Sequence, residues 1–133
     1  MSKIVVLGAQ ESGVGAARLA KLRGLDVFVS DAGTIKPNYR EELKANGIAF
    51  EEGGHTSERV LEADEVVKSP GIPDSASLVT AAIAKGIPVI SEIEFAYRYC
   101  NGRIIAITGS NGKTTTTLLT HHILQKAGLD VAV

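Results

Sequence analysis

The sequence has little cysteine, no long apolar run and no excess of either charge. Cys100 is its single cysteine, so a disulfide framework within the chain is excluded and a reducing, cytoplasmic location is expected. No stretch approaches the roughly 20 apolar residues that a membrane-spanning helix needs, and the N-terminal apolar run is too short for a signal peptide. The net charge of −1 gives no sign of the basic surface that binds nucleic acid, nor of a polybasic membrane signal.

Short apolar, β-branched runs recur along a chain whose composition is ordinary for a globular protein. Hydrophobic residues make up 44% and charged residues 22% of 133 residues, which suits one compact domain, or one small domain and part of another. Most of the runs are solidly apolar, as in strands of a parallel sheet that are buried on both faces. The expected strands are 4–7, 27–29, 48–50, 65–67, 88–90, 104–107 and 131–133.

Segments with helical character lie between these runs, and several of them end at a glycine. The expected helices are 13–23, 39–46, 57–63, 75–85 and 114–127. The repeated order of strand, helix, glycine and strand is typical of stacked βαβ units with right-handed crossovers. The sequence therefore predicts an α/β protein. It has a Rossmann-like open parallel sheet with flanking helices, followed by the first strand, P-loop and helix of a second α/β ATPase domain.

A domain boundary is predicted where the strand pattern restarts. Residues 92–100 are expected to form a short linking helix, and Asn101-Gly102 a turn. The predicted domains are 1–93, which binds a nucleotide substrate, and 94–133, the linker and truncated start of an ATP-binding domain. The final expected strand has no later partner, and a few strand residues with one helix cannot bury a core. We therefore expect Ile104–Ile107 to stay partly uncovered.

The first glycine loop runs from Gly8 to Gly13, between an apolar strand and a helix. A dinucleotide fingerprint would lie here, but Gln10 replaces its middle glycine and obstructs the usual NAD pose. Asp31 ends the next strand, about where an acid meets a ribose hydroxyl. Amides at the start of the helix and the Ser12 hydroxyl would attract a phosphate. We favour a nucleotide site other than an NAD site, and a purely structural turn is the alternative.

The second glycine loop is the strongest signal in the chain. An apolar strand is followed by Gly109-Ser110-Asn111-Gly112-Lys113-Thr114-Thr115 and then by a helix. This order is the context that a P-loop requires, in the shorter G-x-x-G-K-T form. Backbone amides would form an anion nest, Lys113 would meet the β and γ phosphates, and Thr114 would bind Mg²⁺. A tight turn with an exposed lysine is the alternative.

The remaining reactive side chains give no sign of a further site. His121 and His122 are adjacent on an expected helix, so they face different directions and are poorly placed to chelate one metal. His55 follows two glycines without a nearby Cys or His, and we interpret it as a loop residue. Cys100 has no base beside it in the sequence, so a buried or linker thiol is expected.

These motifs resemble those of the Mur ligase family. The stretch from Thr108 to Thr115 is similar to the family's ATP loop. Ser69-Pro70-Gly71-Ile72 resembles a turn of its D-glutamate-adding MurD branch, and Ser91–Phe95 resembles the segment joining that branch's first two domains. The resemblance runs from about residue 3 to the chain end. It implies a three-domain ligase of peptidoglycan biosynthesis, of which this chain is the N-terminal part.

The resemblance implies an ATP-dependent reaction that joins D-glutamate to UDP-N-acetylmuramoyl-L-alanine. ATP, with Mg²⁺, phosphorylates the substrate carboxylate, and the amine attacks the acyl phosphate. The residues implied in UDP binding are Glu11, Ser12, Asp31, Ala32, Gly33, Ser69, Pro70 and Gly71. Those implied in ATP binding are Gly109, Ser110, Asn111, Gly112, Lys113, Thr114 and Thr115, with Lys113 and Thr114 catalytic and Thr114 on the metal.

The sequence leaves three other functions open. A sibling Mur ligase would add a different amino acid, although the Ser69–Ile72 turn opposes it. A complete, stand-alone nucleotide-binding module is opposed by the unfinished second domain. A dehydrogenase domain is opposed by Gln10 and by the second phosphate loop. Because the remaining catalytic groups of the family fall after Val133, this chain is expected to be inactive as a ligase by itself.

Overall fold

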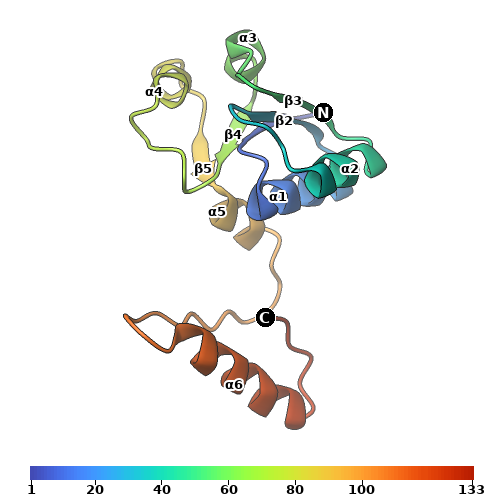
Figure 1. Cartoon of the computed structure of the whole chain (residues 1–133), viewed down its shortest axis with the longest axis vertical. Coiled ribbons are helices and arrows are strands. Elements are labelled where there is room, and N and C mark those ends of the chain that lie inside the picture. The colour runs from blue at the N-terminus through green and yellow to red at the C-terminus, as the bar shows by residue number, and fades with distance from the viewer. The chain divides into compact units, whose positions relative to one another are not determined.

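The computed structural model describes residues 1–133, which form two compact units, Met1–Cys100 and Asn101–Val133. The first unit holds a five-stranded parallel sheet in the order β3-β2-β1-β4-β5 (Figure 1). This confirms the predicted Rossmann-like parallel sheet. Its strands are β1 Lys3–Leu7, β2 Asp26–Asp31, β3 Ala49–Glu52, β4 Glu65–Lys68 and β5 Val89–Ser91. Its helices are α1 Glu11–Leu22, α2 Pro37–Ala45, α3 Ser57–Leu61, α4 Ser77–Ala84 and α5 Glu92–Tyr97.

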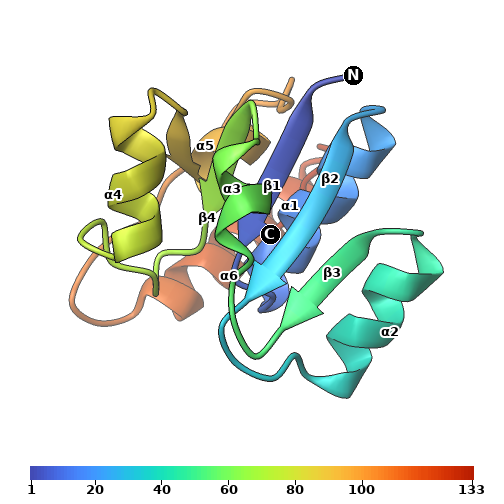
Figure 2. The same ribbon diagram turned by 90° about the horizontal axis from the view of Figure 1, so that it is seen from above.

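The central strand shows why the apolar runs do not alternate with polar residues. Along β1, Ile4 and Val6 enter one hydrophobic cluster, whereas Val5 and Leu7 enter a second cluster. Successive strand side chains point to opposite faces, so a strand covered on both sides needs apolar residues at every position. The first cluster receives side chains from α1, α2 and α5, and the second receives them from α3 and α4. Figure 2 shows α1 and α3 on opposite faces of the sheet.

The strand order creates a switch point between β1 and β4. From β1 the chain proceeds outward through β2 to β3, and then returns to the other side of β1 to form β4 and β5. Crossovers on the two sides of this point run in opposite directions. In open α/β sheets, ligands bind outside the carboxyl ends of the strands at such a switch point.

The linking segment packs with the first unit, which ends at Cys100 rather than at the predicted residue 93. Phe95 of α5 is buried in the cluster beneath α1 and meets Tyr99 edge to face. The Arg98 guanidinium donates two hydrogen bonds, of 2.7 and 3.0 Å, to the Glu65 carboxylate at the start of β4. Residues 94–100 therefore belong to the first unit by packing.

The second unit contains one helix, α6 Lys113–Lys126, and no strand. The predicted strands 104–107 and 131–133 are therefore wrong for this structure, because no neighbouring strand supplies hydrogen bonds to either segment. As expected, the apolar side chains are uncovered: Ile104 is 57% and Ile105 56% exposed. Throughout the chain, no helix has the length and apolar character needed to cross a membrane.

Candidate nucleotide site and phosphate loop

Gly8, Gly13 and Ser69 converge at the switch point. Gly8 follows β1 with a φ of 94°, and its amide donates to the Ser30 carbonyl oxygen. A Cβ on Gly13 would lie 2.0 Å from the Gly8 carbonyl oxygen, and one on Gly8 would lie 2.6 Å from Ser69 Oγ. Both positions therefore need glycine. Without side chains there, the first turn of α1 packs against the Gly8 carbonyl group, and Gly8 packs against Ser69 in the loop after β4.

The Ser69 hydroxyl is buried without a partner. Ser69 is 9% exposed, and its Oγ makes no hydrogen bond within the protein. Leaving a buried hydroxyl unpaired costs about 1–3 kcal/mol, so such groups usually have a ligand, a water molecule or a strained neighbour to account for them. The position of Ser69 next to a glycine loop makes its hydroxyl a candidate hydrogen-bond donor to a ligand.

The N-terminus of α1 is also left without a side-chain cap. Gln10 occupies the N-cap position but makes no capping hydrogen bond, and the first amide bonded within the helix is that of Val14, to the Gln10 carbonyl. The preceding amides therefore remain available, at the positive end of a 12-residue helix. Uncapped amides of this kind attract anions, above all phosphates.

Asp31 holds the loops after β1 and β2 together. Its two carboxylate oxygens accept hydrogen bonds from the amides of Ala9 at 2.6 Å and Gly33 at 2.8 Å. Charge-assisted bonds to backbone amides are short and strong, so the carboxylate fixes both loops. In this structure Asp31 acts first on the protein's own backbone, and a contact with a ribose or a base would share oxygens that are already engaged.

The turn after β4 is fixed by Lys68, which sequence analysis did not single out. Its ammonium donates to the Ile72 carbonyl oxygen at 2.9 Å and lies 3.0 Å from the Asp74 carboxylate. The Ile72 amide in turn donates to the Ser69 carbonyl oxygen. Lys68 therefore stabilises the turn, and its ammonium is already paired with protein groups. An anion at this site would be attracted by the backbone amides and the Ser69 hydroxyl.

The structure brings most of the residues predicted to bind UDP to one edge of the sheet. The loops after β1, β2 and β4 all emerge at the carboxyl ends of adjacent strands. In these loops Ser69 is buried and Asp31 half-buried. The predicted residues with exposed side chains or backbone are Glu11, Ser12, Ala32, Gly33, Pro70 and Gly71.

A polar network at the ends of β2 and β3 was missed by sequence analysis. Ser30 Oγ lies 2.6 Å from both Glu51 Oε1 and His55 Nδ1, and Thr56 donates to both Glu51 oxygens. Burial raises the pKa of the Glu51 carboxyl, but the hydrogen bonds from Ser30 and Thr56 outweigh this effect and leave the pKa below its ordinary value. A serine at the end of an apolar strand was the only sequence signal.

The second glycine loop leads directly into α6. Gly109 and Gly112 have φ values of 154° and 76°, and Gly112 caps α6 in the left-handed conformation. The Lys113 ammonium donates to the Gly109 carbonyl oxygen at 2.6 Å, so it already lies across the loop. Thr114 and Thr115 are exposed in the first turn of α6. The residues predicted to bind ATP thus extend from the loop before α6 into the first turn of that helix.

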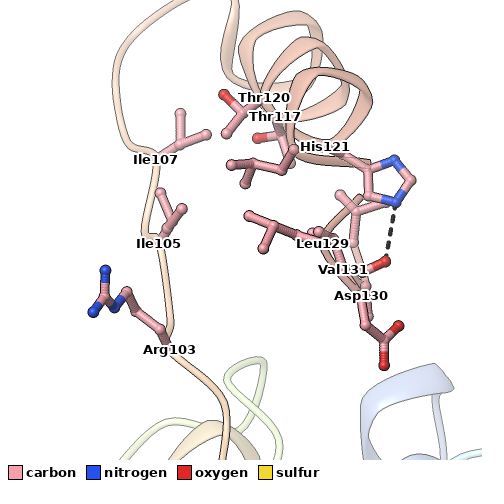
Figure 3. A pocket seen from close by; sticks show the side chains of 12 residues that line it. Arg103, Ile105, Ile107, Thr117, Thr120, His121, Leu129, Asp130 and Val131 are labelled. Carbon is pink, nitrogen blue, oxygen red and sulfur yellow. Dashed lines mark hydrogen bonds between the residues drawn. The ribbon is translucent and has the colours of Figure 1, made fainter. Parts of the chain in front are cut away.

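A cavity of about 330 Å³ lies elsewhere in the second unit. Ile105 and Ile107 line one side, Thr117 and His121 of α6 another, and Val131 the far side (Figure 3). His121 Nε2 lies 3.2 Å from the Val131 carbonyl oxygen. None of the residues predicted to bind ATP lines this cavity, so it is separate from the glycine loop.

The fold and the first site define a doubly wound α/β domain with a glycine loop at its switch point, followed by a unit that carries a second glycine loop. Residues 2–91 match the family described as Mur ligase MurD-like, N-terminal domain. The chain belongs to this family.

Two curated relatives cover nearly all of this chain. It is 59% identical over 133 residues to the UDP-N-acetylmuramoylalanine–D-glutamate ligase of Bacteroides fragilis, covering 100% of this chain and 30% of the relative. It is 60% identical over 130 residues to the ligase of the same name from Porphyromonas gingivalis, covering 98% and 29%. The chain thus spans about 30% of the length of these relatives.

Solved structures of Mur-type ligases share the fold. A murein peptide ligase from Psychrobacter arcticus matches with a TM-score of 0.73 and 28% identity, covering 98% of this chain and 28% of that chain. A pseudomurein peptide ligase type C from Methanothermus fervidus matches with a TM-score of 0.65 and 30% identity, covering 100% and 28%.

Proposed function

We propose that the first unit binds the UDP part of UDP-N-acetylmuramoyl-L-alanine. In the full ligase, the chain would serve the ATP-dependent addition of D-glutamate in peptidoglycan biosynthesis. The reaction named for the Bacteroides and Porphyromonas relatives supports this substrate. The observation that carries the proposal is the unpaired, buried Ser69 hydroxyl beside the uncapped N-terminus of α1. A diphosphate would satisfy both, because it offers several strong hydrogen-bond acceptors and negative charge.

Different loops would bind different parts of the UDP group. Amides at the start of α1 and the Ser69 hydroxyl would donate to the diphosphate, while the exposed backbone at Ala32 and Gly33 would lie against the uracil. Asp31 holds the loops after β1 and β2 in fixed positions relative to each other, because its carboxylate accepts hydrogen bonds from an amide of each loop. Lys68 keeps the Ser69 turn in place over the site. Gln10 stands in the sequence where the NAD fingerprint has the glycine that lets the pyrophosphate approach the backbone.

The second glycine loop would hold ATP and Mg²⁺, and its residues fit these groups. The left-handed Gly112 and the free amides that follow it suit a phosphate chain, and the Lys113 ammonium would leave the Gly109 carbonyl for the phosphates. Thr114 would place its hydroxyl on Mg²⁺. ATP supplies the phosphoryl group that turns a carboxylate, a poor electrophile, into an acyl phosphate that an amine can attack.

Titration of the purified chain tests the proposal for the first unit. We expect saturable binding of UDP-N-acetylmuramoyl-L-alanine and of UDP, measured calorimetrically, and no binding of NADH. Ser69→Ala should weaken binding of both UDP ligands by about fivefold to tenfold, because one hydrogen bond to the diphosphate is lost. Tight NADH binding without a response to UDP would refute the proposal. A preference for a substrate that lacks the L-alanine would point to a sibling ligase.

The second unit is tested separately, with Mg-ATP. Lys113→Ala should weaken ATP binding while leaving UDP binding unchanged, since the two loops lie in different compact units. We also propose that the chain alone forms no amide bond, because it spans about 30% of the ligases it matches. Release of ADP that depends on D-glutamate would contradict this.

A further inference from the structure

The loop between β3 and α3 is bonded to the end of β2. The Gly53 amide donates to the Gly33 carbonyl oxygen at 2.9 Å, and the Gly54 amide to the Asp31 carbonyl oxygen at 3.3 Å. Gly53 and Gly54 have φ values of 79° and 156°, which residues with a side chain rarely adopt. His55 follows directly, so its position is tied to the segment 31–33, where the proposed function places the nucleobase.

The protons in the Ser30 network determine which nitrogen of His55 carries hydrogen. The Glu51 carboxylate has a lowered pKa, so near neutral pH it is ionised and only accepts hydrogen bonds. The single hydrogen of the fully buried Ser30 hydroxyl must therefore point to Glu51. The contact of 2.6 Å between Ser30 Oγ and His55 Nδ1 is then made by an Nδ1–H that donates to the serine oxygen.

This arrangement leaves His55 Nε2 as a hydrogen-bond acceptor. In a neutral imidazole only one nitrogen carries hydrogen, so a protonated Nδ1 means a lone pair on Nε2. Nε2 has no partner in the protein and is not enclosed, and His55 is half-buried. It is also the only imidazole in the first unit. The network thus presents one oriented acceptor next to the loop after β2.

We propose that His55 selects the nucleobase, with its Nε2 accepting a hydrogen bond from N3–H of uracil, and that Ser30 and Glu51 are positioning residues for it. The inference rests on the proposed function, because it assumes that the UDP group lies along the loops after β1 and β2. The exposed backbone at Ala32 and Gly33 offers no side chain that reads a base. Thr34 of the same loop is exposed as well, but its hydroxyl can turn to donate or to accept, whereas the Ser30 network fixes the acceptor of His55.

The chemistry of the base makes the proposal specific. Uracil carries a donor at N3, whereas cytosine carries a lone pair there, which would face the lone pair of Nε2. A site that presents an acceptor thus favours uracil and disfavours cytosine through an unpaired and repulsive contact. Because the imidazole is partly open to water, we expect a preference for UDP over CDP of about tenfold rather than several orders of magnitude.

The test compares UDP and CDP binding to the whole 133-residue chain. The wild-type protein should bind UDP about tenfold more tightly than CDP. His55→Ala should bring the two dissociation constants close together, mainly by weakening UDP. Ser30→Ala should reduce the preference while keeping the imidazole. His122→Ala removes an exposed imidazole of α6 in the second unit, which is no part of the Ser30 network, and should leave the ratio unchanged; thermal unfolding checks that each variant is folded.

A second measurement on the wild-type protein does not depend on a variant. Imidazole ¹⁵N chemical shifts should show His55 with hydrogen on Nδ1 and a free lone pair on Nε2, and UDP but not CDP should shift the Nε2 signal. A hydrogen on Nε2, equal affinity for UDP and CDP, or an unchanged ratio in His55→Ala would each overturn the proposal for His55 while leaving UDP binding in place. Failure of the wild-type chain to bind either nucleotide would overturn the proposed function as well.

Discussion

Replacement of Gly13 by alanine tests whether the close approach of α1 to the glycine loop is essential. A Cβ at this position would lie 2.0 Å from the Gly8 carbonyl oxygen and 3.4 Å from Ser69 Oγ. Ordinary contact begins near 3.4 Å, and the atom in the way belongs to the backbone, so no flexible side chain can move aside. Gly15 provides a matched control in the same helix, because a Cβ there meets nothing within 4 Å.

The two substitutions should have opposite effects on the free energy of unfolding. Alanine in place of glycine within a helix gains up to about 1 kcal/mol, so Gly15→Ala should be stabilising. Overpacking costs about 1–3 kcal/mol, and the severity of the contact places Gly13→Ala at the upper end of this range. Since the gain in helix propensity is similar in both variants, their difference isolates the steric cost, about 3 kcal/mol. For a domain of this size the difference corresponds to a Tm gap of about 15 °C.

Urea and thermal unfolding followed by circular dichroism would measure the gap, and titration with UDP would show whether the distorted turn still binds. We expect Gly13→Ala to lose both stability and UDP affinity, and Gly15→Ala to keep the affinity of the wild type. If Gly13→Ala proved as stable as Gly15→Ala, the close approach would not constrain the turn. Gly13 would then not be needed to shape the site.

Three further perturbations have defined outcomes. Asp31→Ala removes the acceptor of two loop amides and should lower the free energy of unfolding by about 2 kcal/mol, with weaker UDP binding in titration. Arg98→Ala breaks a partly exposed ion pair in which Arg98 Nη1 donates to both Glu65 oxygens, so urea unfolding should show a loss of about 1 kcal/mol, and hydrogen exchange in α5 should accelerate. The folded-state pKa of Glu51 lies below 4.5, so its stabilisation is present above pH 4.5 and is lost as the pH falls through the lowered value. Unfolding between pH 6 and pH 3 should therefore depend less on pH in Glu51→Gln, and an equal slope would contradict the assignment.

Much of the first unit could be predicted because its strands are buried on both faces. The run from Ile4 to Leu7 needs no tertiary information to be recognised as a central parallel strand, since every position is apolar. The glycine loops were equally visible, because the positive φ values at Gly8 and Gly112 are tolerated by few residues other than glycine. Helix ends were predicted within a few residues, as glycines after the helices mark where each one stops.

The predictions failed where the structure depends on neighbours. Residues 104–107 have a strand composition but form no strand, because a strand is defined by hydrogen bonds to another strand and none lies beside this segment. The division between the two units was placed too early for a related reason. Phe95 and Arg98 show no periodic signal that links them to α1 and β4, and only packing reveals those contacts.

The sequence by itself determined the class of fold, the two glycine loops and the family, since each depends on local pattern: apolar runs, glycine at strained positions, and a short motif before a helix. Only the tertiary structure decided what the side chains at the carboxyl edge do. It placed the carboxylate of Asp31 on backbone amides, left the Ser69 hydroxyl buried and unpaired, and brought His55 to Ser30. These contacts join residues that are distant in the sequence, and their geometry is set by the parallel register of adjacent strands.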